Sequence, residues 1–191
     1  MDRMGEPQAI AARARRRTVP IAIVALVVGA VVGVLFTDDA SALERVLTVL
    51  GFALALGGLS GAVSLLPATF RLAPSMQLPV RDLDAADRRA VQRAVYAGRP
   101  IEPSDSALAV RAAEWARGAV ASLPHARAQF LLLFAGIGGP QLPNVIRDDA
   151  WSAGFSRVFV TALVVVGIAA AISSGRNIRG TRRYLAATAE G

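Results

Sequence analysis

The side chains that could perform chemistry lie at the ends of apolar stretches. Asp38, Asp39 and Glu44 form one acidic group, and Asp148 and Asp149 form a second one. Paired carboxylates can bind a cation or transfer protons, but both tasks require fixed geometry. Because these groups stand on short segments between apolar runs, we interpret them as solvated loop ends.

Other catalytic chemistry is poorly supported by the sequence. The chain has no cysteine, which excludes disulfides, thiolate nucleophiles and cysteine metal ligands. Its single histidine, His125, leaves too few ligands for a zinc or haem site within one chain. The sequence also lacks nucleophile-elbow, phosphate-loop, zinc-protease and dinucleotide-binding motifs. We therefore predict no catalytic residue, no metal, no cofactor and no enzymatic activity.

Arg157 is the one charge inside the expected limits of an apolar span, if that span starts at Trp151. A charge inside a membrane is a candidate for function. Here, however, the arginine lies about two helical turns from the start of the span. It can reach outwards or pair with Asp148 or Asp149, so we interpret it as an interfacial side chain.

These residues are set among apolar runs that are long enough to cross a membrane. Of the 191 residues 54% are hydrophobic, above the ~45–50% of soluble domains. Residues 19–36, 46–70 and 158–175 are uncharged, and a bilayer core requires ~17–25 apolar residues. They predict three transmembrane helices, of which the second should end near Pro67.

The uncharged stretch 128–146 predicts a further crossing of irregular shape. Its first half is strongly apolar, but its second half combines glycines and prolines with the amides Gln141 and Asn144. Such a sequence cannot stay a regular helix. The stretch is therefore either a short, broken span or a re-entrant segment.

Charge balance distinguishes between these alternatives. Residues 1–18, 71–127 and 173–191 each carry a net charge of +3, whereas 37–46 carries −2 and 147–157 carries 0. Basic segments stay in the cytoplasm, and four spans place all three on one side. Three spans and a re-entrant loop would move the C-terminal arginines across the membrane. We therefore predict a multi-pass protein of the bacterial inner (plasma) membrane, with both termini cytoplasmic.

The N-terminus also has the outline of a cleaved signal peptide. An arginine-rich start, an apolar run and the tripeptide Ala40-Ser41-Ala42 resemble its three regions. Against cleavage, the run of 18 residues exceeds the usual ~7–15. We predict that the run stays in place as the first span.

Small residues are spaced for close packing of the first two spans. Gly29 and Gly33 lie four residues apart in the first span, as do Gly57 and Gly61 in the second. Small residues at this spacing form a flat stripe on which two helix backbones can approach. Glycine is also common in membrane helices without such a role. The presence of both motifs on adjacent antiparallel spans favours the packing interpretation.

The basic segment between the second and third spans predicts a helical hairpin. Asp84 is placed to cap a first helix that ends at Gly98. Ser104 or Asp105 is placed to cap a second helix that ends at Pro124. Each helix repeats apolar residues along one side. Because fewer than ~40 residues rarely form a stable core, the hairpin should lean on the membrane surface or on a partner.

Arginines cluster on the first helix of this hairpin. Arg88, Arg89 and Arg93 lie within two turns, with the last two stacked four residues apart. Anionic lipid attracts each arginine held near it by ~1 kcal/mol. We predict that these arginines contact anionic lipid at the cytoplasmic face or the acidic face of a partner. Membrane topology accounts for the net charge of +7, so we predict no nucleic-acid partner.

The hairpin carries a recognisable motif. It reads Ala90-Val91-x-Arg93-Ala94-Val95-x-x-Gly98-Arg99-Pro100-x-Glu102, then Leu108-Ala109 and an alanine-rich helix. With the arginine-rich tail that follows the last span, it resembles a segment of small multi-pass membrane proteins of actinobacteria. The resemblance covers about residues 84–183. That family has no assigned activity, so the resemblance implies no catalytic residue.

Together these features predict an all-α integral membrane protein with four transmembrane helices arranged as two hairpins. The expected parts are an N-terminus, a helix pair, a cytoplasmic helical hairpin, a second helix pair with a broken first member, and an arginine-rich tail. Their bounds are 1–18, 19–70, 71–127, 128–175 and 176–191.

The predicted function is that of a non-enzymatic scaffold, assembly or regulatory factor. The hairpin arginines and an exposed Trp115 would contact a partner membrane protein or a second copy of the chain. The alternative is a subunit of an oligomeric transporter or channel, in which Gln141 and Asn144 supply ligands at a broken helix. The lack of a charged residue at a midplane disfavours it. A membrane enzyme ranks last.

Overall fold

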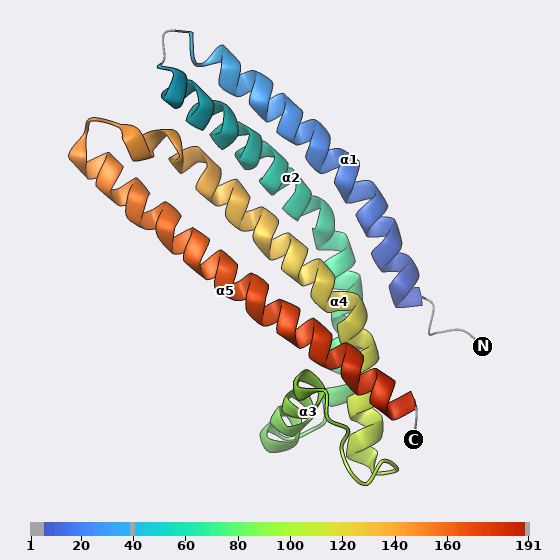
Figure 1. Ribbon diagram of the computed structural model, residues 1–191. Helices are drawn as coiled ribbons and strands as arrows, with labels where there is room; N and C mark the ends of the chain where they lie inside the picture. Colours follow the sequence, from blue (N-terminus) through green and yellow to red (C-terminus); the bar gives the residue numbers. More distant parts are fainter. Residues whose placement is uncertain (1–5, 39–40, 190–191) are drawn as a thin grey trace. The chain divides into compact units, whose positions relative to one another are not determined.

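The structure, a computed structural model, describes residues 6–38 and 41–189, with side chains from residue 9 onward (Figure 1). This part of the chain is built from helices, as the sequence predicts. Its α-helices are α1 (Glu6–Leu35), α2 (Ala42–Gln77), α3 (Ala85–Ala97), α4 (Ala107–Gly138) and α5 (Ala150–Ala189). Short 3-10 helices follow α2 and α4, namely η1 (Leu78–Val80), η2 (Gly139–Gln141) and η3 (Pro143–Ile146).

Four of these helical stretches are long and apolar enough to cross a membrane. They are Ala9–Leu35, Ala42–Val80, Ala107–Ile146 and Ala150–Ala189. At most 33% of the most apolar window of any of them is buried within the chain. Apolar surface of this extent on a single chain is typical of helices that lipid or other proteins cover.

Prolines fail to end two of the predicted helices. The predicted end of a span at Pro67 is wrong, because α2 continues to Gln77. The predicted end of the hairpin at Pro124 is also wrong, because α4 continues to Gly138. A proline removes one backbone donor and bends a helix, but packing on both sides can keep the helix continuous. Just beyond Pro67, Leu72 is only 1% exposed.

The chain divides into two compact units. Unit 1 comprises Met1–Arg13, Pro67–Arg127 and Ala171–Gly191, and unit 2 comprises Ala14–Leu66 and Ala128–Ala170. Helices α1, α2, α4 and α5 each contribute one segment to each unit, whereas α3 belongs wholly to unit 1.

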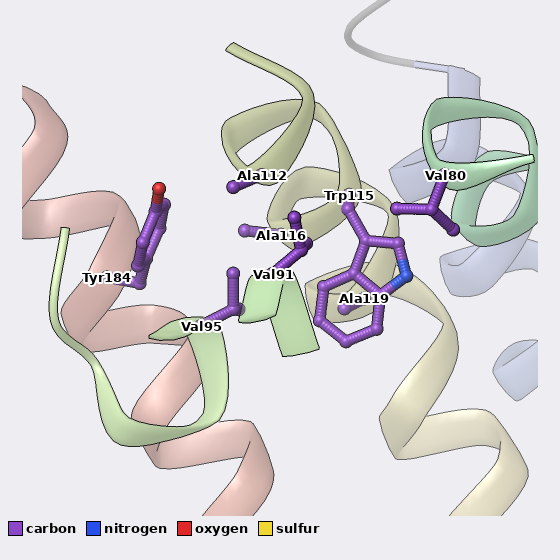
Figure 2. Packing of buried hydrophobic residues seen from close by; sticks show 8 residues of the cluster. All are labelled: Val80, Val91, Val95, Ala112, Trp115, Ala116, Ala119 and Tyr184. Carbon is purple, nitrogen blue, oxygen red and sulfur yellow. The ribbon is translucent and has the colours of Figure 1, made fainter. Parts of the chain in front are cut away.

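Unit 1 has a hydrophobic core of its own. Figure 2 shows Trp115 beside Val80, with Tyr184 at the opposite edge of the cluster. The cluster comprises Val80 of η1, Val91 and Val95 of α3, Ala112, Trp115, Ala116 and Ala119 of α4, and Tyr184 of α5. Trp115 is 2% exposed, so the prediction of an exposed tryptophan is wrong. Its ring meets Tyr96 edge to face, with centroids 5.3 Å apart, and burial raises the pKa of Tyr96.

The end of α5 completes this core. The residues expected to form an arginine-rich tail are helical up to Ala189. Ile178, Thr181 and Tyr184 on this segment are buried. The hairpin therefore packs against a third helical segment of the same chain, which supplies apolar surface that two short helices lack.

The ends of α3 agree with the sequence. The Asp84 carboxylate accepts a hydrogen bond from the Asp87 backbone amide at 2.7 Å. Gly98 ends the helix with a φ of 70°, a left-handed conformation that glycine adopts without strain. The cap of α4 differs from the prediction, because Ser106, rather than Ser104 or Asp105, accepts a hydrogen bond from the Ala109 amide at 3.2 Å.

Candidate functional site

The predicted packing glycines of α1 lie against the backbone of α2. A Cβ atom added at Gly29 would overlap the carbonyl oxygen of Phe52. A Cβ atom added at Gly33 would lie 2.6 Å from the Cα of Val49. Contacts this short leave room for glycine alone.

The predicted glycines of α2 face α1 less tightly. A Cβ at Gly57 would lie 3.0 Å from the Leu26 Cβ, and one at Gly61 would lie 3.3 Å from the Ala22 Cβ. Gly61 also faces α4, where the Leu132 Cδ1 would be 3.1 Å away. The glycines of α1 therefore make closer contacts in this helix pair than the glycines of α2.

The structure also contains close glycine contacts between α2 and α4, which the sequence analysis did not predict. A Cβ added at Gly58 would lie 2.5 Å from both the Gly136 amide nitrogen and the Leu132 carbonyl oxygen. A Cβ added at Gly51 would lie 2.6 Å from the carbonyl oxygen of Gly139. Gly51 and Gly58 are seven residues apart and so share one helix face. That spacing is the signal by which the sequence could have revealed them.

The irregular segment that follows α4 forms a polar cluster. Regular α-helix gives way to η2 and η3 after Gly138, within the stretch where the sequence predicts that a regular helix cannot continue. The Gln141 Oε1 accepts hydrogen bonds from the Ser156 Oγ at 3.0 Å and the Asn144 Nδ2 at 3.3 Å. In a transporter the Gln141 Oε1 would be expected to bind the ligand. Here it is hydrogen-bonded to two side chains of the same chain.

The charges near this cluster bind the backbone. The Arg157 Nε donates to the Val145 carbonyl oxygen at 2.9 Å. The Asp149 Oδ2 accepts a hydrogen bond from the Ser152 amide at 3.0 Å and caps α5. Hydrogen bonds from the Ser152 side chain and backbone hold the pKa of Asp149 below its usual value. Asp39, of the other acidic group, lies outside the described residues.

The three arginines of α3 differ in their surroundings. The Arg88 guanidinium donates to the carbonyl oxygens of Leu83 at 3.2 Å and Arg81 at 3.4 Å. Arg88 therefore fastens the segment that leads into α3, a role that the sequence did not predict.

Arg89 and Arg93 instead form an exposed basic face. Both are exposed, and they lie roughly half a turn around the helix from Val91. Val91 and Val95 are fully buried in the core of unit 1. The helix thus presents one face to the core and two guanidinium groups on the other.

The end of α3 packs closely on α5. A Cβ added at Gly180 would overlap the carbonyl oxygen of Tyr96. The Arg183 Cβ would lie 3.0 Å from a Cβ added at Gly98. A cation near the C-terminus of a helix interacts favourably with the exposed carbonyl groups there. Both contacts join segments that lie about 85 residues apart in the chain.

A half-open groove of about 980 Å³ lies on the same unit. Its walls come from the linker between α3 and α4, the first turns of α4 and the end of α5. The residues that carry charge or hydroxyl groups there are Glu102, Ser104, Glu114, Arg117, Tyr184 and Thr188.

His125 links the start of α1 to α4 within unit 1. Its Nε2 lies 3.1 Å from the Ala11 carbonyl oxygen, and its Nδ1 lies 3.0 Å from the Ala121 carbonyl oxygen. The ring thus lies between two backbone carbonyl oxygens. Within residues 6–38 and 41–189, His, Asp and Glu side chains do not gather in threes to form a metal site.

Comparison with protein-family models, curated proteins and solved structures finds no match to this chain.

Proposed function

We propose that this chain is a multi-pass plasma-membrane protein of a bacterium, and that unit 1 is a cytoplasmic binding module by which it scaffolds, assembles or regulates a partner. The observation that carries the proposal is the pair of exposed arginines, Arg89 and Arg93, on a helix whose other face is fixed in a folded core. A rigid basic face of this kind can bind anionic lipid headgroups.

The division into units supports the membrane part of the proposal. The boundaries at Pro67, Arg127 and Ala171 fall near the ends of the uncharged runs. Unit 1 thereby collects the basic segments 71–127 and 173–191, and unit 2 collects most of the apolar residues. In a four-span topology the basic segments stay in the cytoplasm, with α1–α2 and α4–α5 as membrane hairpins.

Reporter fusions test this topology. Fusions after Arg17, Arg99 and Arg183 should all report the cytoplasm, because each follows or lies within a basic segment. A fusion after Asp39 should report the exterior. An exterior signal at Arg183 alone would mean three spans and a re-entrant loop.

Binding to vesicles tests the basic face. Replacing Arg89 and Arg93 by glutamate should weaken binding of the purified protein to phosphatidylserine-containing vesicles by more than about thirtyfold, since each arginine contributes ~1 kcal/mol and each glutamate adds repulsion. The measurement is co-sedimentation with the vesicles, at low salt, of protein held in neutral nanodiscs. Binding to neutral phosphatidylcholine vesicles should be the same for both proteins.

A charge-matched control separates a specific face from total charge. Arg179 and Arg182 are exposed on α5 of the same unit. Their replacement by glutamate gives the same change in net charge and should weaken binding much less. Equal losses in the two double variants would mean that only net charge matters, and the proposal of a binding face on α3 would fail.

A further inference from the structure

The groove of unit 1 has an apolar floor. Val110 is 51% exposed although it lies on a unit with a folded core. Ala109 and Ala113 of α4 and Pro100 and Pro103 of the linker also line the groove. An apolar surface in a concave site is the usual feature that takes up an apolar side chain of a ligand.

The charges at the groove are predominantly acidic. Glu102 comes from the linker and Glu114 from α4, while Arg117 is the only basic side chain in its lining. The chain as a whole carries a net charge of +7. Long-range attraction therefore draws anions to this protein, and only a local acidic site can select a cation.

Tyr184 adds a polar group in need of a partner. Its side chain is fully buried at the edge of the core (Figure 2). The backbone of Ile101 lies near its hydroxyl group, but no described group reaches hydrogen-bond geometry with it. Buried hydroxyl groups are normally hydrogen-bonded, and an exception calls for an explanation. Tyr184 also lines the groove, so an acceptor on a ligand that displaces the linker at Ile101 would satisfy it.

We infer that the groove binds a short peptide segment of a partner protein, in which a basic side chain stands next to an apolar one. The basic side chain pairs with Glu102 and Glu114, and the apolar side chain packs on Val110. A carbonyl oxygen of the peptide accepts a hydrogen bond from Tyr184. The inference rests on the proposal that unit 1 is a binding module, and it names the chemistry of the partner. The half-open shape suits an extended chain that enters and leaves the site.

Fluorescence anisotropy tests the inference on the full-length protein in a neutral detergent. The probe is a labelled, end-capped heptapeptide of alternating leucine and arginine, and the comparison probe has glutamate in place of arginine. The arginine probe should bind measurably more tightly than the glutamate probe. Equal binding of the two probes would overturn the inference, since detergent and general apolar contact would then explain both.

Substitutions at the groove locate the site. The double variant Glu102→Gln/Glu114→Gln should weaken binding of the arginine probe about tenfold. The control Asp82→Asn/Asp87→Asn removes the same charge from exposed positions of unit 1 and should leave binding unchanged. Equal weakening in both variants would mean that net charge alone controls probe binding. That result would contradict a site in the groove.

Tyr184→Phe separates ligand binding from folding. Loss of an unpaired buried hydroxyl should raise the Tm by about 4 °C. The same change should weaken the arginine probe about fivefold, because the bound peptide loses its donor. Unchanged probe binding would show that Tyr184 has no part in the site. Vesicle binding through Arg89 and Arg93 should persist in every groove variant, so failure of the groove and failure of the proposed function give different results.

Discussion

Replacing Gly180 by alanine should destabilise unit 1 by about 2 kcal/mol. The added Cβ would overlap the carbonyl oxygen of Tyr96, which belongs to the backbone and cannot rotate away. Overpacking costs about 1–3 kcal/mol where flexible side chains can adjust, and we expect more than that range here. Alanine also favours a helix over glycine by about 1 kcal/mol, which offsets part of the loss.

Gly175 provides a matched control on the same helix. The nearest atom to a Cβ added there is the Arg127 Nη1 at 3.7 Å, an ordinary contact with the end of a flexible side chain. Gly175→Ala should therefore leave stability unchanged or raise it. The chain has two tryptophans, so in a Trp151→Phe background Trp115 alone reports unfolding by its fluorescence. A Gly180→Ala variant as stable as Gly175→Ala would mean that α3 and α5 are not packed this closely.

Local signals in the sequence were sufficient to place α3. Asp84 and Gly98 act on their own backbone, and their effect depends on neighbours within four residues. Uncharged runs likewise located the four apolar stretches, because a run reports its own length and composition. Fold class and the bounds of this helix therefore follow from the sequence.

Features that depend on distant segments could not be predicted in this way. Pro67 and Pro124 are strong local breakers, but α2 and α4 continue past them. Packing of the surrounding residues, such as Leu65 and Leu72 on either side of Pro67, can hold such a helix together. Trp115 lies in the first turns of α4, and the segments that cover it could not be identified from periodicity. Its burial depends on Val80 and on Tyr96, whose ring packs edge to face against it.

The candidate site illustrates the same division. Arginines at 88, 89 and 93 are visible in the sequence as a cluster, but only the backbone around Leu83 shows that Arg88 fastens a loop. The groove was not predicted at all. Its walls come from two stretches that lie far apart in the sequence, 100–117 and 184–188, and neither Glu102 nor Glu114 is unusual until the fold places both at one concave surface.

Replacing Gly58 by alanine should destabilise unit 2 by about 2 kcal/mol, since overpacking costs up to about 3 kcal/mol and alanine regains about 1 kcal/mol of helix propensity. The new Cβ would lie 2.5 Å from the Gly136 amide nitrogen and from the Leu132 carbonyl oxygen, so α2 and α4 would have to separate. In a membrane, helices associate chiefly through such close packing, and separation loses contacts along the whole interface. Thermal unfolding in detergent, followed by far-UV circular dichroism, should give a lower Tm.

Gly154→Ala on α5 is the control, because nothing lies within 4 Å of its added Cβ. Its Tm should match or exceed that of the original protein. If the Gly58→Ala variant has the same Tm as the Gly154→Ala variant, the α2–α4 contact does not stabilise unit 2.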